Sequence, residues 1–256
     1  MHGQNRTAGY GGAGMSESTG TSETTGTILV GPSQTVSSIT LRPDRARSLF
    51  LLGHGAGAGM RHPFLESLAQ RLASREVATL RYHFPYMERG GRRPDPPSLL
   101  LATVNAAAAV AREMAPDLRL FAGGKSMGGR ITSMAAADGT LGDVRGLIFV
   151  GYPLHAPGKG GARAPASRRE HLSHIAAPML FLQGTRDELA DIDEIRKVCV
   201  SLGDRALLGI FPDADHSFHV PKRSGRTDDE VLDDLAETID LWTRTQGEDH
   251  PLRTDE

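Results

Sequence analysis

A glycine-rich turn between a buried strand and a helix limits the folds open to this chain. Residues 118–123 are mostly apolar and typical of a strand buried on both faces, and residues 127–137 have a helical pattern. Between them, residues 124–128 read GKSMG. This is the G-x-S-x-G pattern in its required context of strand, sharp turn and helix, where it raises a serine above a parallel sheet as a nucleophile.

The same alternation of short apolar runs and helical patterns extends along most of the chain. Strands are predicted at residues 48–53, 77–82, 118–123, 146–151, 179–183 and 206–211, with an antiparallel pair at 27–31 and 37–41 before them. Helices are predicted at residues 63–74, 98–115, 127–137 and 191–202, and a last helix opens with the capping box of Thr227 and Glu230. This order predicts an α/β fold, a mostly parallel sheet with helices on both faces.

The ends of the chain are polar and differ from the rest. Residues 1–26 are dominated by Gly, Ser and Thr, which predicts a disordered N-terminal segment. Residues 247–256 form a polar C-terminal tail. One domain is therefore expected over residues 27–246.

Charge and hydrophobicity exclude several classes of partner. The formal net charge is −2, so no basic face for a nucleic acid is expected. No uninterrupted apolar run approaches the ~18 residues of a membrane span, and no signal-peptide core follows Met1, so we expect a cytoplasmic protein. The single cysteine, Cys199, falls on the apolar stripe of a predicted helix and is expected in the core.

Ser126 is the candidate nucleophile at the first turn. A side chain at position 124 or 128 would crowd the turn, and the Met127 N–H is expected to face a developing oxyanion. The letters GKS also end a phosphate-binding loop, but that motif needs glycine where this chain has Arg119.

A second glycine-rich turn, residues 53–59, reads GHGAGAG after an apolar strand. Such a loop supplies the second oxyanion N–H in hydrolases of this architecture, here expected from Ala56, with Gly57 as the second choice. His54, Gly57, Lys125 and His155 are expected to contact the substrate. The turn also matches a dinucleotide-binding fingerprint, for which Arg81 would suit a 2′-phosphate, although the helix start is delayed to Pro63.

Two further strand ends supply an acid and a base. Asp187 follows the strand at residues 179–183, and His216 follows the strand at residues 206–211. The chain order Ser126, Asp187, His216 is the order this architecture requires, with Asp187 orienting the histidine and His216 taking the serine proton. His219 is the reserve base, and the reserve acids are Asp191, Asp213 and Asp215.

With these residues the chain resembles the α/β-hydrolase superfamily over most of residues 27–246. The segments 53–57, 124–130, 152–155, 183–188 and 215–217 resemble a subgroup that includes testis-expressed protein 30, bacterial predicted hydrolases and the hydrolase-like domain of a non-specific-lethal chromatin complex subunit. The subgroup is related in style to dienelactone hydrolases, although the nucleophile here is serine. The resemblance implies the fold and a Ser–Asp–His site, and it supplies no substrate.

Only a short insert separates the strand that ends at residue 151 from the strand that begins at residue 179, and its residues 152–169 are rich in Pro, Gly and Arg, which predicts at most a small lid. The function expected from the sequence is hydrolysis of an ester or thioester bond in a small acyl substrate, without a cofactor or metal. Two alternatives stay open: a non-catalytic hydrolase-fold domain that binds a protein partner, and a dinucleotide-binding protein.

Overall fold

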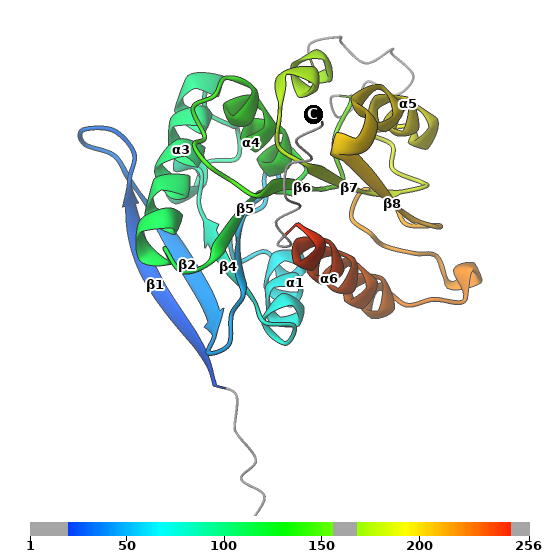
Figure 1. Cartoon of the computed structure of the whole chain (residues 1–256), viewed down its shortest axis with the longest axis horizontal. Coiled ribbons are helices and arrows are strands. Elements are labelled where there is room, and N and C mark those ends of the chain that lie inside the picture. The colour runs from blue at the N-terminus through cyan, green and yellow to red at the C-terminus, as the bar shows by residue number, and fades with distance from the viewer. Residues whose placement is uncertain (1–19, 156–167, 247–256) are drawn as a thin grey trace, which may run out of the picture.

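An eight-stranded sheet crosses the whole structure, a computed structural model that describes residues 20–155 and 168–246 (Figure 1). The strands are β1 (Thr21–Leu29), β2 (Thr35–Pro43), β3 (Ser48–Gly53), β4 (Val77–Tyr82), β5 (Arg119–Lys125), β6 (Gly146–Val150), β7 (Met179–Gly184) and β8 (Ala206–Phe211). Their order in the sheet is β1-β2-β4-β3-β5-β6-β7-β8. Strand β2 runs antiparallel to β1 and β4, and β3 to β8 are parallel.

Helices cover both faces of this sheet. The α-helices are α1 (Pro63–Ala73), α2 (Pro85–Glu88), α3 (Pro97–Met114), α4 (Met127–Ala137), α5 (Ile192–Leu202) and α6 (Asp228–Thr245), and the short 3₁₀ helices are η2 (Glu170–His174), η3 (Gly203–Arg205) and η4 (Lys222–Ser224). Apolar residues of α1 and α6 share one core cluster, and those of α3, α4 and α5 share another. Figure 1 shows these two groups of helices on opposite sides of the sheet.

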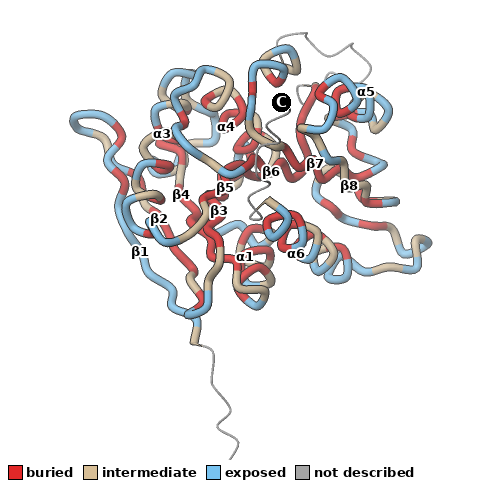
Figure 2. Tube along the Cα trace, in the orientation of Figure 1, coloured by how far each residue is buried: buried red, intermediate tan, exposed pale blue. Residues whose placement is uncertain are grey.

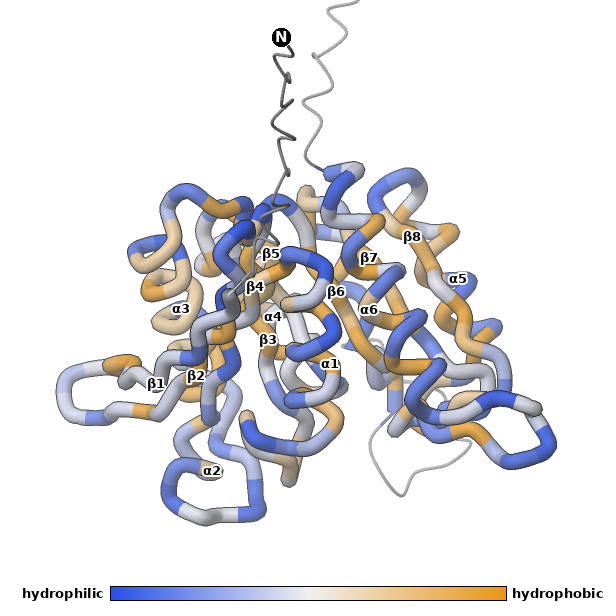
Figure 3. Tube along the Cα trace, turned by 90° about the horizontal axis from the view of Figure 1, so that it is seen from below, coloured by the Kyte–Doolittle hydropathy of each residue, from blue (hydrophilic) through white to orange (hydrophobic). Residues whose placement is uncertain are grey.

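The two-residue period of a strand explains this division. In β3, Leu49 and Leu51 belong to the cluster with α3 to α5, whereas Phe50 and Leu52 belong to the cluster with α1 and α6. A strand with helices on both faces therefore needs apolar side chains at every position. Figure 2 shows the central strands buried, and Figure 3 shows the hydrophobic residues concentrated along them.

The predicted fold is confirmed, and the six parallel strands lie within two residues of their predicted bounds. Cys199 is buried on α5 as predicted, and burial raises the pKa of its thiol to about 11. A small lid was expected within residues 152–169, of which 156–167 lie outside the described residues.

The predicted start of the domain was too late. Strand β1 begins at Thr21 and pairs with β2 along its whole length, so residues 21–26 belong to the sheet. These residues are exposed because β1 is an edge strand with little packed against it. Their polar composition predicts disorder, whereas backbone pairing with β2 holds them in the sheet.

Among the described residues, no helix combines the length and apolarity needed to cross a membrane. The carboxyl ends of β3 to β8 lie along one edge of the sheet, because these strands are parallel. The four turns that carry Ala56, Ser126, Asp187 and His216 follow β3, β5, β7 and β8. The topology therefore brings them to the same edge.

Candidate active site

Ser126, His216 and Asp187 form one hydrogen-bonded chain at the carboxyl edge of the sheet. The Ser126 Oγ lies 2.9 Å from His216 Nε2, and His216 Nδ1 lies 2.7 Å from Asp187 Oδ2. The side chain of Asp187 is fully buried, whereas that of His216 is 24% exposed. A neutral imidazole that donates from Nδ1 to the carboxylate keeps Nε2 free to accept the serine proton.

The backbone at Ser126 is strained and is fixed by glycines. Ser126 has φ 51° and ψ −113°, a conformation that a residue with a side chain rarely adopts. A Cβ at Gly124 would lie 2.2 Å from the Gly53 carbonyl oxygen, and one at Gly128 would lie 2.4 Å from the same atom. Only glycine fits at both positions, so β3 and the turn after β5 pack backbone against backbone.

The carboxylate of Asp187 is held by two groups besides His216. The Gln183 side-chain amide donates to Asp187 Oδ2 at 2.6 Å, and the Leu189 N–H donates to Oδ1 at 2.8 Å. Gln183 is itself buried, and its Oε1 accepts the Tyr152 N–H at 3.0 Å. Gln183 is not among the predicted site residues, although a polar residue at the end of an apolar strand indicates that it has a partner there.

Two backbone N–H groups are available to an oxyanion. Those of Ala56 and Met127 donate to no other group among the described residues. Gly57, the second choice, donates its N–H to the Tyr86 hydroxyl at 3.2 Å and does not line the cavity. A Cβ at Gly55 would lie 3.7 Å from the Ser126 Cβ, so the loop that carries Ala56 passes directly beside the serine.

A cavity of about 290 Å³ opens over the serine. Its lining residues are Gly55, Ala56, Ala58, His62, Phe64, Leu65, Lys125, Ser126, Leu189, His216 and Ser217. The lining is mostly apolar away from the reactive groups. It includes Lys125, one of the residues predicted to contact the substrate, and this lysine donates from Nζ to the backbone carbonyl of His216.

His54 and His155 were also predicted to contact the substrate, and the structure places both outside the cavity lining. The His54 ring is fully buried: its Nε2 accepts the Phe84 N–H at 3.0 Å, and its Nδ1 donates to the Gly55 carbonyl at 2.8 Å. Burial lowers the pKa of His54 to about 4, so the ring is neutral near pH 7. His54 thus fastens the loop from inside, and a loop histidine in the sequence gave no sign of this.

His155 packs against α5 instead. Its Nε2 lies 3.4 Å from Glu194 Oε2, and its N–H donates to the Leu189 carbonyl at 2.7 Å. It therefore contacts the backbone of Leu189, a residue that lines the cavity.

The reserve residues have other partners. His219 is exposed and pairs with Asp228, which raises the pKa of the imidazole through a hydrogen bond of 2.8 Å. Asp191 caps α5 by accepting the Asp193 and Glu194 N–H groups. Asp215 accepts the N–H groups of Ser217 and His219, and Asp213 lies at a left-handed turn of the same loop.

Arg81, the residue that would suit the 2′-phosphate of a dinucleotide, also has another partner. Arg81 is 1% exposed, and its Nη1 donates to the Met60 carbonyl at 3.0 Å. The guanidinium thus holds the loop after β3 and does not face solvent, where a 2′-phosphate would bind. Within the described part of the chain, no group of three or more metal-ligating side chains comes together.

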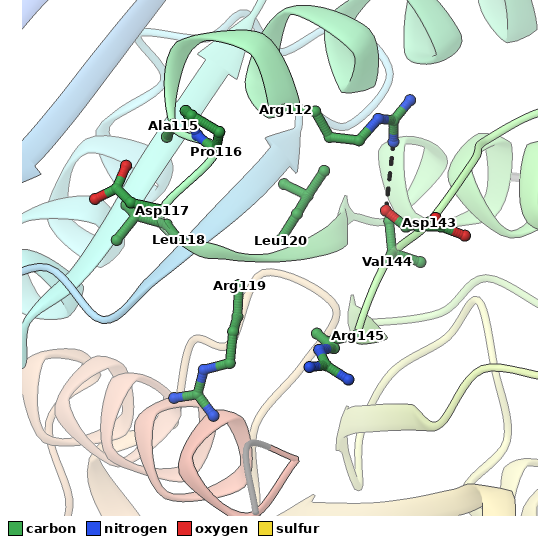
Figure 4. A pocket seen from close by; sticks show the side chains of 10 residues that line it. All are labelled: Arg112, Ala115, Pro116, Asp117, Leu118, Arg119, Leu120, Asp143, Val144 and Arg145. Carbon is green, nitrogen blue, oxygen red and sulfur yellow. Dashed lines mark hydrogen bonds between the residues drawn. The ribbon is translucent and has the colours of Figure 1, made fainter. Parts of the chain in front are cut away.

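A larger cavity, of about 700 Å³, lies at the amino ends of β5 and β6, the edge opposite to Ser126. Figure 4 shows Arg119 and Arg145 extending to one side of it, while Arg112 reaches the Asp143 carbonyl. None of the predicted site residues lines this cavity.

The chain matches a known protein family in sequence and several solved proteins in structure. A family described as "Alpha/beta hydrolase domain" matches residues 46–244. Dienelactone hydrolase from Anabaena variabilis has a similar structure, with a TM-score of 0.69 and 22% identity over 88% of this chain and 98% of that one. A serine hydrolase without a lid from Xanthomonas campestris gives 0.64 and 21% over 86% and 94%, and an esterase domain from Rhodothermus marinus gives 0.66 and 14% over 88% and 98%.

Proposed function

Because the chain belongs to the alpha/beta hydrolase domain family, we propose that it is a serine hydrolase that cleaves an ester or thioester bond of a small acyl substrate. Ser126 is the proposed nucleophile, His216 the general base and Asp187 the acid that orients the base. The observation that carries the proposal is the hydrogen-bonded chain of 2.9 Å and 2.7 Å through these three side chains. The position of Ser126 at a strained turn supports it, as do the Ala56 and Met127 N–H groups, which have no partner among the described residues.

The first half of the reaction would form an acyl-enzyme. The Ser126 Oγ attacks the acyl carbonyl carbon while His216 Nε2 takes its proton, and the carbonyl π electrons move to the oxygen. That oxyanion accepts hydrogen bonds from the Ala56 and Met127 N–H groups. The tetrahedral intermediate then collapses, and the leaving alcohol or thiol takes the proton from His216.

The second half returns the serine. Water attacks the acyl carbon as His216 Nε2 takes its proton, and Ser126 leaves with that proton when the second intermediate collapses. Asp187 stays ionised and stabilises the imidazolium in both halves. The buried amide of Gln183 keeps the carboxylate in place, because a fully buried anion needs such donors.

The cavity indicates short acyl groups. Its volume of about 290 Å³ falls at the lower end of the ~300–1,000 Å³ range of ligand pockets. Phe64, Leu65 and Leu189 contribute apolar surface against which a short acyl chain can pack. Esters of two to four carbons are expected to react faster than those of eight or more.

A fluorophosphonate probe tests the nucleophile without knowledge of the substrate. The wild-type protein is expected to be labelled, and the Ser126→Ala variant is expected not to be. The His216→Ala variant is expected to be labelled at least about 10³-fold more slowly, because the hydroxyl then lacks a base. Thermal unfolding of each variant shows whether it has the wild-type fold.

Folded wild-type protein that resists the probe would contradict the proposal and favour the non-catalytic binding domain. Labelling that persists in Ser126→Ala would place the reactive group elsewhere. Acyl preference is then measured with aryl esters of increasing chain length. The Leu189→Ala variant is expected to shift that preference towards longer chains by a factor of a few, because Leu189 borders the cavity.

A further inference from the structure

Lys125 occupies an unusual place for a lysine. It is the residue before Ser126, at the end of β5, and its side chain passes beneath the glycine-rich loop, since a Cβ at Gly55 would lie 3.8 Å from the Lys125 Cγ. Its Nζ donates to the backbone carbonyl of His216 at 2.5 Å. The lysine therefore connects the residue beside the nucleophile to the residue that carries the base.

The ammonium also lies close to the imidazole ring. A Cβ at Gly151 would lie 3.1 Å from Lys125 Nζ and 3.5 Å from His216 Nδ1, so both groups pack against the same glycine. The Phe218 and Phe64 rings lie 5.6 Å and 6.0 Å from Nζ. These rings shield the ammonium from water and attract it weakly through their π faces.

The free energy needed to bury the Lys125 ammonium indicates that this lysine does more than stabilise the fold. No carboxylate of the described residues lies within ion-pair distance of Nζ, and the His216 carbonyl is its one hydrogen-bond partner there. Burial lowers the pKa of Lys125 to about 8, although Asp187 and Asp215 raise it from further away. Removing a cation from water costs free energy, and a single hydrogen bond to a carbonyl offsets only part of that cost. A role for Lys125 is therefore sought in the residue that it contacts, His216.

The other polar contacts that the His216 loop, residues 212–219, makes with neighbouring elements lead to the turn after β7 and to the start of α6, where His219 pairs with Asp228. The Arg186 N–H donates to the Ala214 carbonyl, and the Asp213 N–H donates to the Thr185 hydroxyl. These contacts fix the loop relative to Asp187. Within the described part of the chain, Lys125 makes the one polar contact between this loop and the turn after β5 besides the reacting hydrogen bond between Ser126 and His216.

We propose that Lys125 is a positioning residue, whose ammonium ties the His216 backbone to the nucleophile turn and keeps the base at hydrogen-bond distance from Ser126. This inference rests on the proposed function, because it concerns the reaction between these two residues. Displacement of a reacting group by about 1 Å can cost ~10²-fold in rate. A tie that acts on the backbone of the base prevents such a displacement.

The test compares Lys125→Met, Lys125→Arg and the wild type by their rates of fluorophosphonate labelling between pH 6 and 10. Methionine keeps the length of the stem without a donor or charge, and we expect labelling to slow by about 10- to 100-fold. Arginine keeps the hydrogen-bond donor and the positive charge, so Lys125→Arg is expected to recover most of the wild-type labelling rate. Lys222→Met, which removes an exposed lysine of η4, is the matched control and should leave the rate unchanged.

The pH profile separates positioning from packing. The charged groups that act on the Lys125 ammonium are Asp187 and Asp215. Above a pH of about 8 the amine loses its charge and with it the attraction to these carboxylates, so wild-type labelling should decline there. The Lys125→Arg variant stays charged and should lose this decline. A Lys125→Met variant with the wild-type rate and profile, or a folded Lys125→Arg variant as slow as Lys125→Met, would overturn the proposal.

Hydrogen–deuterium exchange distinguishes failure of this inference from failure of the proposed function. Backbone amides of residues 212–219 are expected to exchange faster in Lys125→Met than in the wild type or Lys222→Met. If the wild type does not react with the probe but this difference is seen, the tie exists and the serine hydrolase proposal is wrong. If the wild type reacts and the amides exchange equally in all variants, the tie is absent.

Discussion

The two loops that meet at the active site are held in different ways. The turn around Ser126 is fixed by backbone packed on backbone, because Gly124 and Gly128 both press against Gly53. The loop around His216 has one such backbone contact, where a Cβ at Gly184 would lie 2.3 Å from the Ala214 oxygen, and it is otherwise held by side chains: Lys125 from β5 and Arg186 from the turn after β7. Its own Asp215 accepts two N–H groups of the loop.

This difference predicts how each loop responds to substitution. Backbone packing has no flexible part, so an added methyl group at the serine turn must displace a strand. Side-chain anchors are several and partly independent, so the loss of one should weaken the histidine loop by degrees. One substitution at the serine turn should therefore abolish the position of Ser126, whereas each substitution at the histidine loop should displace His216 only in part.

The largest effect is expected from Asp187→Asn. The change preserves size but lets the amide donate to His216 Nδ1, which favours the tautomer with its proton on Nε2, so the base no longer accepts from Ser126. We expect the labelling rate to fall by about 10⁴-fold and the melting temperature to decrease, because the Gln183 amide, which donates to the same oxygen, then loses its acceptor. A decrease of less than tenfold would mean that another group orients the base.

The Gly128→Ala variant tests the serine turn. The new Cβ would lie 2.4 Å from the Gly53 oxygen and 2.5 Å from its carbonyl carbon, and neither atom can move without β3. We expect a loss of about 3 kcal/mol in the free energy of unfolding and of most labelling, measured by chemical denaturation and the probe. Gly26→Ala, which meets only a serine hydroxyl at 3.1 Å in β2, is the control. A Gly128→Ala variant that keeps the wild-type free energy of unfolding and loses only part of its labelling would contradict the proposed difference between the two loops.

The Gln183→Leu variant removes the amide that holds Asp187. It leaves the Tyr152 N–H without its acceptor and the carboxylate with one donor fewer. Labelling is expected to slow by about tenfold, and the free energy of unfolding to fall by about 1–3 kcal/mol. Gln183→Glu separates the two functions, since it keeps an acceptor for Tyr152 and places a second carboxylate beside Asp187. An unchanged rate in both variants would show that Asp187 needs no support.

The smallest effect is expected from Asp215→Ala. The carboxylate accepts the Ser217 and His219 N–H groups, which shape the loop after His216. Its loss should reduce the free energy of unfolding by about 1 kcal/mol and slow labelling by a factor of a few, because the Lys125 and Arg186 contacts remain. A complete loss of labelling in a folded variant would mean that the loop also fails as a unit, and the contrast between the two loops would disappear.

The sequence by itself determined the sheet and the serine turn. Apolar runs of strand length, the glycines around Ser126 and the order of serine, aspartate and histidine each reflect local chemistry, so the parallel strands and the edge that carries the site were predictable. An edge strand is the exception: residues 21–26 are polar and pair through their backbone, which leaves little pattern in the sequence.

Only the tertiary structure decided which polar residues serve the site. His54 and Lys125 both lie in glycine-rich turns beside the predicted nucleophile, yet the ring of His54 faces the interior and the lysine lines the cavity. Gln183 supports Asp187 while its other end accepts the N–H of Tyr152, which lies 31 residues earlier in the chain. A side chain's role depends on which carbonyl or amide the folded chain brings within about 3 Å, and contacts between residues distant in sequence leave no local pattern.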